Sequence, residues 1–90
     1  MNIQRKFETF NQQNPVVYRE LVRLARIAKV AGINSYSAKA MLETLRFNFT
    51  LKRQGNSFKI NNNFTSRYAR LIEKKESDLQ GFFETRKLKA

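Results

Sequence analysis

Turn-forming residues are scarce in this chain, and their positions constrain its fold more than any other feature. Its 90 residues include three glycines, Gly32, Gly55 and Gly81, and one proline, Pro15. Glycine and proline are the residues that most often interrupt regular structure, so these four positions divide the chain into segments of helical length. We see no internal repeat, low-complexity tract or linker, and we therefore expect a single domain over residues 1–90.

The segment after Pro15 has the pattern of an amphipathic helix, predicted over 15–31. Asn14 is a typical N-cap, and proline is favoured at the first helical position. Gly32 is placed to end the helix. Apolar residues on one helical face lie at Val17, Leu21, Leu24, Ala25 and Ala28. The opposite face carries Arg19, Arg23 and Arg26 with Lys29 beside them, which we interpret as a solvated surface, with contact to a phosphate backbone as the alternative.

Two further helices are predicted, over 38–51 and 62–76. Ser35 or Ser37 can cap the first of them. The apolar faces consist of Met41, Leu42, Leu45 and Phe49 in the first helix and of Phe64, Tyr68, Leu71 and Ile72 in the second. Residues 3–13, which precede the helix over 15–31, are a lead-in that can form a short helix and pack on the core.

Between the second and third main helices, residues 52–57 read as a basic turn and Phe58–Ile60 as a short strand. Residues 77–81 predict a turn, and 82–88 are either a strand that pairs with Phe58–Ile60 or an ordered tail. The expected fold is therefore mainly α, a three-helix winged-helix or helix-turn-helix-like domain with a small β-hairpin. The long connection favours the winged or a variant form, because a simple helix-turn-helix has a turn of about 3–4 residues.

Charge is the strongest indication of function. Eighteen Lys and Arg oppose seven Asp and Glu, giving a formal net charge of +11. A charge of this size repels itself within a compact chain, and a polyanionic partner explains it most simply. We expect nucleic acid, with an acidic protein surface as the alternative. No apolar run reaches the roughly 20 residues that cross a bilayer, so no membrane role is expected.

The start of the helix over 62–76 is the best candidate for contact with bases and phosphates. Its outward or sideways residues can all form hydrogen bonds with nucleic acid, as a recognition helix requires. They are Asn62, Asn63, Thr65, Ser66, Arg67 and Arg70. Backbone charge would come from Lys52, Arg53, Lys59, Arg86, Lys87 and Lys89. The alternatives are that the polar residues only cap the helix, or that they bind a protein.

The sequence argues against an enzyme. It contains no Cys and no His, so the commonest bases and soft metal ligands are missing. The carboxylates are scattered, and Glu73, Glu76 and Asp78 are interpreted as solvated surface rather than as a magnesium site. The glycines are too far apart for a phosphate-binding loop. We expect no cofactor and no metal. The aromatic residues are expected to pack in the core, with stacking of single-stranded bases on Phe58, Phe82 and Phe83 as the alternative.

Four runs of the sequence resemble a family of small phage- and prophage-encoded proteins of unassigned function. They are Phe7–Phe10, Phe58–Asn63, Ser66–Leu71 and Gly81–Leu88. The resemblance implies a mobile-element origin and a bacterial cytoplasm, and it transfers no active site. It suggests a DNA-binding regulator or packaging factor, or an inhibitor of a host defence enzyme.

Together these observations predict a small phage-type DNA-binding protein that uses the helix over 62–76 for recognition of double-stranded DNA. One alternative is a protein-binding inhibitor of a host enzyme, which would present a sizeable apolar surface outside the basic patch. Another alternative is an RNA-binding protein. A homodimer is compatible with the small footprint of one 90-residue unit, although no heptad seam is visible.

Overall fold

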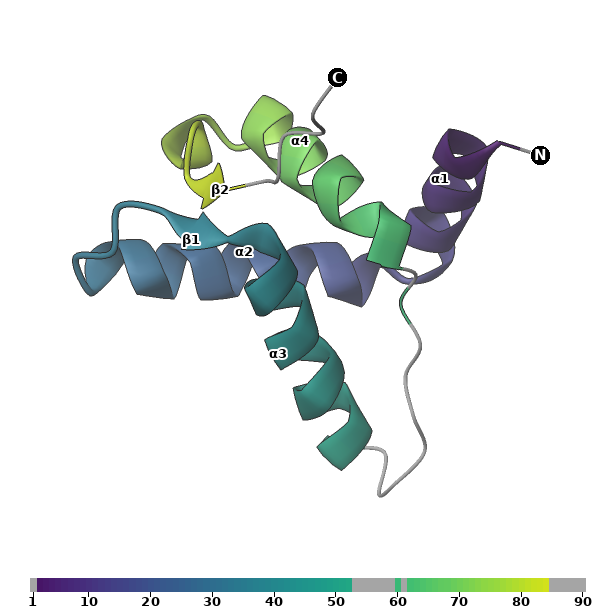
Figure 1. Ribbon diagram of the computed structural model, residues 1–90, viewed down its shortest axis with the longest axis horizontal. Coiled ribbons are helices and arrows are strands. Elements are labelled where there is room, and N and C mark those ends of the chain that lie inside the picture. The colour runs from purple at the N-terminus through teal and green to yellow at the C-terminus, as the bar shows by residue number, and fades with distance from the viewer. Residues whose placement is uncertain (1, 53–59, 61, 85–90) are drawn as a thin grey trace.

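The computed structural model describes residues 2–52, 60 and 62–84, with the side chains of 50–52 and 62 left out. Within them lie the α-helices α1 (Ile3–Gln13), α2 (Pro15–Val30), α3 (Ala38–Lys52) and α4 (Thr65–Lys75). Two 3₁₀ turns, η1 (Asn62–Phe64) and η2 (Ser77–Leu79), flank α4, and the strands are β1 (Tyr36–Ser37) and β2 (Phe83–Glu84) (Figure 1). The mainly α class with a small β element is confirmed. None of the helices in these ranges is long and apolar enough to cross a membrane.

The junction of α1 and α2 is built around Asn14. Its backbone N–H and its side-chain Nδ2 both donate to the carbonyl of Phe10, at 2.8 and 3.0 Å. Asn14 is the residue before α2, as predicted, but its side chain does not cap that helix. It closes the end of α1 instead. Because Pro15 has no N–H, the first turn of α2 loses little without a cap.

Glycine ends α2 where the sequence predicts. The N–H of Ile33 donates to the carbonyl of Ala28 at 3.0 Å, and the N–H of Gly32 donates to the carbonyl of Lys29 at 3.0 Å. This pair of bonds is a Schellman motif, which requires a left-handed residue at its centre. Gly32 supplies that conformation with φ +95°. The chain then reverses toward β1, and the Ser37 hydroxyl accepts from the N–H of Ala40 at 3.2 Å to cap α3.

The β element differs from the predicted hairpin. β1 and β2 pair in parallel, with Tyr36 opposite Phe83 and Ser37 opposite Glu84. A parallel pair needs a long crossover, which α3 and α4 provide between the two strands. Of the strand predicted at Phe58–Ile60, the first two residues lie outside the described part of the chain, and Ile60 belongs to no strand. Ile60 is buried in the core, which accounts for its apolar side chain without a sheet.

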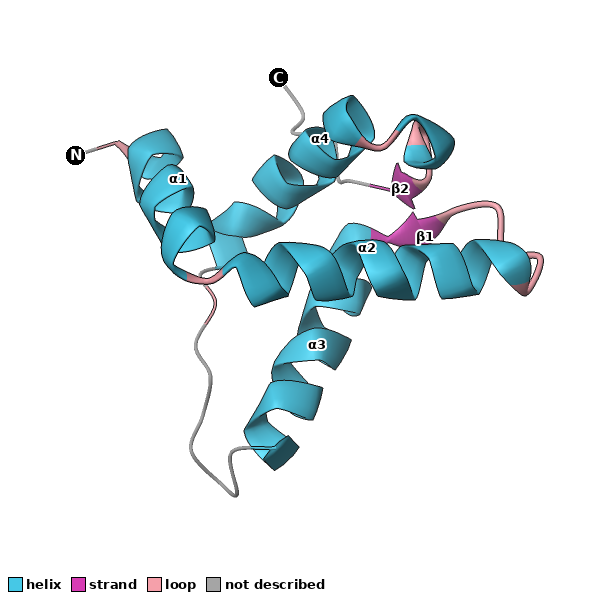
Figure 2. Cartoon of the chain, turned by 180° about the vertical axis from the view of Figure 1, so that it is seen from behind, coloured by secondary structure: helices cyan, strands magenta, loops and turns pink. Residues whose placement is uncertain are grey.

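Helix α2 is at the centre of the fold and is covered by the other three helices (Figure 2). It buries Val17, Leu21, Val22 and Ala25. Facing them are Ala38, Met41, Leu42, Leu45 and Phe49 of α3, and Tyr68, Ala69 and Ile72 of α4. The lead-in is a full helix, and its Phe7 ring packs edge-on against the rings of Phe64 at 5.5 Å and Tyr68 at 4.7 Å. Leu79, Phe82 and Phe83 cover the remaining end of the core.

Candidate nucleic-acid interface

The packing of α4 separates an apolar face from a polar one. Tyr68, Ala69 and Ile72 are buried against the core. The face of α4 opposite these buried residues, together with the turn before it, forms what we call the α4 ridge. It consists of Asn63, Ser66, Arg70 and Lys74. Asn63, Arg70 and Lys74 are exposed, and Ser66 is half-buried. Every side chain of the ridge is able to form hydrogen bonds with a base edge or a phosphate.

The two cations of the ridge have no acidic partner. Arg70 and Lys74 make no hydrogen bond or ion pair with any residue in the described ranges. The carboxylate of Glu73 lies between them in the sequence, but it accepts the backbone N–H of Phe83 at 3.1 Å. It thereby helps to hold the start of β2. The ridge therefore presents uncompensated positive charge to solvent.

Arg67 was predicted to contact nucleic acid, and the structure gives it a second task. Its Nε donates to Oε1 of Gln4 at 3.1 Å, and its Nη1 donates to the carbonyl of Asn63 at 3.3 Å. These bonds connect α4 to α1 and to the 3₁₀ turn before it. Because a guanidinium carries five N–H donors, others remain available to a ligand. Its contact with bases stays a prediction.

Thr65 lies at the side of α4 that faces α2 and α3. It is half-buried and borders a small internal cavity together with Leu21 and Leu42. This position is sideways, toward the core, and Thr65 is less exposed than Asn63 and Arg70. Asn62 begins η1 and Lys52 ends α3, but their side chains are not described. Arg53, Lys59, Arg86, Lys87 and Lys89 lie outside the described residues.

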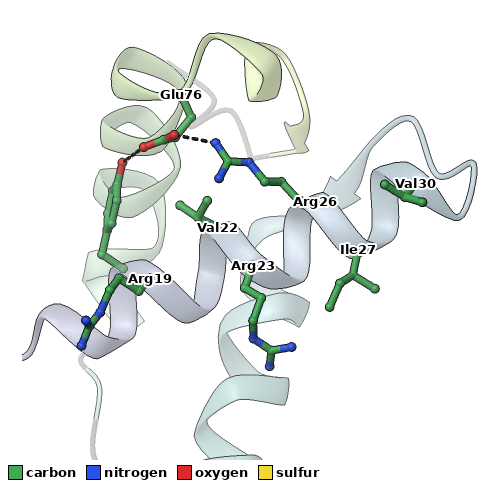
Figure 3. Close-up of a pocket in the computed structure, with 8 residues that line it drawn as sticks. Arg19, Val22, Arg23, Arg26, Ile27, Val30 and Glu76 are labelled. Carbon is green, nitrogen blue, oxygen red and sulfur yellow. Dashed lines mark hydrogen bonds and ion pairs between the residues drawn. The ribbon is translucent and has the colours of Figure 1, made fainter.

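Two of the four cations of the α2 stripe, Arg23 and Arg26, form ion pairs with carboxylates. Arg23 forms a two-pronged ion pair with Glu20, at 2.8 and 2.9 Å. Arg26 reaches across to Glu76 at 2.7 Å (Figure 3). It also contacts Asp78 at 3.1 Å. The Arg26 guanidinium, by hydrogen bonding, lowers the pKa of the Asp78 carboxyl. The interpretation of this stripe as a solvated surface, and the alternative of contact with a phosphate backbone, both stay predictions.

Glu76, the residue before η2, and Asp78 within η2 serve as partners for α2. Lys29 donates to the backbone carbonyl of Asp78, and the Tyr18 hydroxyl donates to Glu76 at 2.9 Å. Burial first, and the Glu76 carboxylate second, raise the pKa of Tyr18 to about 12. With Glu73 bound elsewhere, the three carboxylates do not converge. The described residues contain no group of three or more potential metal-ligating side chains.

Sequence reasoning missed Lys74 as part of the interface. It lies one helical turn beyond Arg70, so extending the outward face from Asn63 by the same periodicity would have found it. The contacts of Arg26 with Glu76 and Asp78 join residues 50 and 52 positions apart, and no local pattern predicts them.

No family model, curated protein or solved structure matches this chain. The resemblance to phage-encoded proteins therefore stays a prediction.

Proposed function

We propose that the protein binds nucleic acid through the α4 ridge. The observation that carries the proposal is a pair of exposed cations, Arg70 and Lys74, that have no partner among the described residues. The other side chains on this face are able to form hydrogen bonds with a base or a phosphate. Arginine and lysine neutralise phosphates and release counterions, which supplies most of the affinity for a polyanion. The net charge of +11 strengthens the attraction at long range.

Double-stranded DNA is the ligand that suits an exposed helix best. The major groove of B-form DNA is about 12 Å wide and admits an α-helix. The major groove of A-form RNA is too deep and narrow for side chains to read. In such a complex Arg70 would contact a guanine or a phosphate, Lys74 a phosphate, and Asn63 and Ser66 base edges or the sugar-phosphate backbone.

The test is the salt dependence of binding to a labelled random-sequence duplex, measured by fluorescence anisotropy. Wild-type protein and an Arg70→Ala/Lys74→Ala variant are compared between about 50 and 200 mM salt, because the slope of log K against log salt falls by about 0.9 for each lost phosphate contact. Arg23→Ala is the matched control. It removes an equally exposed arginine whose charge is already paired with Glu20.

We expect the double variant to bind more weakly and to show a slope reduced by about 2, while the control retains the wild-type slope. A control that loses as much as the double variant would show that only overall charge matters. Absence of duplex binding by the wild-type protein at low salt would refute the proposal. A matching single strand in the same assay decides between duplex and single-strand preference.

The biological setting that we propose is regulation or packaging of DNA in a mobile element, as the resemblance suggests. One ridge offers a small footprint, so we further propose that two copies bind neighbouring half-sites. Sedimentation of the protein with and without a duplex of defined length measures this stoichiometry.

A further inference from the structure

A second surface of the molecule has a different character and lies on the outward side of α2. A shallow groove of about 630 Å³ runs along this helix. We call it the α2 groove, and it is lined by Tyr18, Arg19, Val22, Arg23, Arg26, Ile27, Val30 and Glu76 (Figure 3). The Glu76 carboxylate at its edge is already bonded to Tyr18 and Arg26. It is separate from the α4 ridge, with which it shares no residue.

The apolar part of the groove is more exposed than the core requires. Ile27 is 53% exposed and Val30 is 90% exposed, although both belong to the helix that forms the centre of the fold. They are three residues apart and therefore lie side by side on one face of α2. Val22, which is buried, closes the groove beside them. A partner that covers these two adjacent aliphatic side chains would remove their apolar surface from water, which favours binding.

The polar part of the groove determines the charge of that molecule. Arg19 and Arg23 precede the apolar pair on the same face, at spacings of one to two helical turns. Arg19 makes no ion pair with any residue in the described ranges, and Arg23 uses only two of its five donors on Glu20. Carboxylates are the complementary groups for both arginines.

From this combination we infer that the α2 groove binds an acidic amphipathic helix of a partner protein. Two neighbouring apolar side chains of that helix cover Ile27 and Val30, and carboxylates one to two turns away pair with Arg19 and Arg23. Nucleic acid suits the groove poorly because phosphates gain nothing from exposed aliphatic side chains. A membrane surface would need a broader apolar face than these two residues provide.

A second copy of the chain is the wrong occupant on electrostatic grounds. If two α2 helices paired in antiparallel fashion with Val16 against Val30, the residue midway between them, Arg23, would face its own copy. Each copy also carries a net charge of +11. Like charges in direct opposition disfavour the pair, whereas an acidic helix relieves the same repulsion.

The experiment uses the full chain and a labelled helix-forming peptide of about 18 residues, with leucines on one face and glutamates on the other. The matched control peptide has glutamine at every glutamate. Binding is measured by fluorescence anisotropy, and amide chemical shifts in ¹⁵N spectra locate the contact. The groove variant is Ile27→Gln/Val30→Asn, whose exposed positions leave the core intact. Arg19→Glu probes the charge, and Arg70→Ala/Lys74→Ala is the control variant.

We expect the glutamate peptide to shift amides of α2, and the groove variant to bind it about tenfold more weakly or worse. Arg19→Glu should favour the glutamine peptide over the glutamate peptide, and the control variant should bind as the wild type does. Duplex binding by the groove variant should be unchanged, so this inference and the proposed function fail independently.

Several results would overturn the inference. The first is no binding of the glutamate peptide at about 1 mM. The second is equal binding of the two peptides by the wild type, and the third is a contact that maps to α4. A wild-type dimer that the groove variant converts to a monomer would show that a second copy fills the groove. Binding to phosphatidylserine vesicles that requires Ile27 and Val30, without peptide binding, would identify a membrane as the occupant.

Discussion

Replacing Tyr68 by phenylalanine should stabilise the protein. The Tyr68 side chain is 2% exposed, and its hydroxyl is buried without a hydrogen-bond partner in the part of the chain that the structure describes. Its ring packs edge-on against Phe7, with centroids 4.7 Å apart and planes at 88°. The substitution keeps this ring contact and removes only the oxygen. The unpaired hydroxyl loses its hydration on folding and receives nothing in return.

The expected gain follows from the cost of burying such a group. An unsatisfied buried hydroxyl destabilises the folded state by about 1–3 kcal/mol. The small void left when the oxygen is removed offsets part of the gain in stability. We therefore expect the free energy of unfolding to rise by about 1 kcal/mol. For a domain of this size, that corresponds to an increase in melting temperature of about 4–8 °C.

Urea denaturation followed by circular dichroism measures the change, and Tyr18→Phe is the matched control. The Tyr18 hydroxyl donates to Glu76 at 2.9 Å, so its removal should lower the free energy of unfolding by about 0.5–1.5 kcal/mol. The two substitutions delete the same atom and should have opposite signs. If Tyr68→Phe destabilises the protein as much as Tyr18→Phe does, the Tyr68 hydroxyl has a partner and the reasoning is wrong.

Alkaline pH provides a second measurement on the same two residues. Burial raises the pKa of Tyr68 above its ordinary value, and burial together with Glu76 raises the pKa of Tyr18 to about 12. Between about pH 10 and pH 12 the unfolded chain ionises these tyrosines while the folded chain keeps their protons, so stability falls as pH rises. Each Tyr→Phe variant should lose less stability over this range than the wild type.

The turn, the cap and the acidic partner of α2 give three further predictions. Gly32→Ala should lower the free energy of unfolding by about 1 kcal/mol, because a φ of +95° is strained for alanine. Steric contact is not the cause, since no atom lies within 4 Å of the added Cβ. Gly32→Asn should cost less, and thermal melts of both variants measure the difference. Ser37→Ala should cost about 1 kcal/mol through loss of the α3 cap, and an unchanged melting temperature would contradict the role of that bond. Arg26 lowers the pKa of Asp78, so the stabilising charge is present above about pH 4 and is lost as pH falls below the folded pKa. Asp78→Asn should therefore flatten the acid limb of stability against pH, and a limb as steep as that of the wild type would exclude Asp78 as its source.

Local patterns predicted the helices well because the apolar residues of each helix recur at helical spacing. The expected range 15–31 compares with Pro15–Val30, and 38–51 compares with Ala38–Lys52. Gly32 is the clearest case, since a glycine at the end of an apolar periodicity predicts the Schellman turn that the structure contains. On α4 the pattern placed Arg70 and Asn63 on the exposed face, but it did not show that Thr65 lies toward the core or that Lys74 extends the same face.

Local sequence patterns did not predict the contacts between segments that are far apart in the sequence. Tyr36 and Phe83 pair in parallel across 47 positions, and two-residue strands have no alternation to reveal them. Phe58–Ile60 had a strand-like alternation, and the structure uses Ile60 for the core instead. For the same reason the sequence showed a row of arginines on α2 but not which acids neutralise them.

Residues 64–83 complete the hydrophobic core, so the core cannot form fully until late in the synthesis of the chain. The ribosome releases α1, α2 and α3 first, yet Phe7 and Leu21 are covered only when Phe64, Tyr68 and Phe83 have emerged. Until then the nascent chain exposes the apolar surface that the finished domain hides, and such species are the ones that aggregate. The strong positive charge keeps neighbouring nascent chains apart over this interval. The charge for which we propose a polyanionic partner would thus also protect the chain before it can fold.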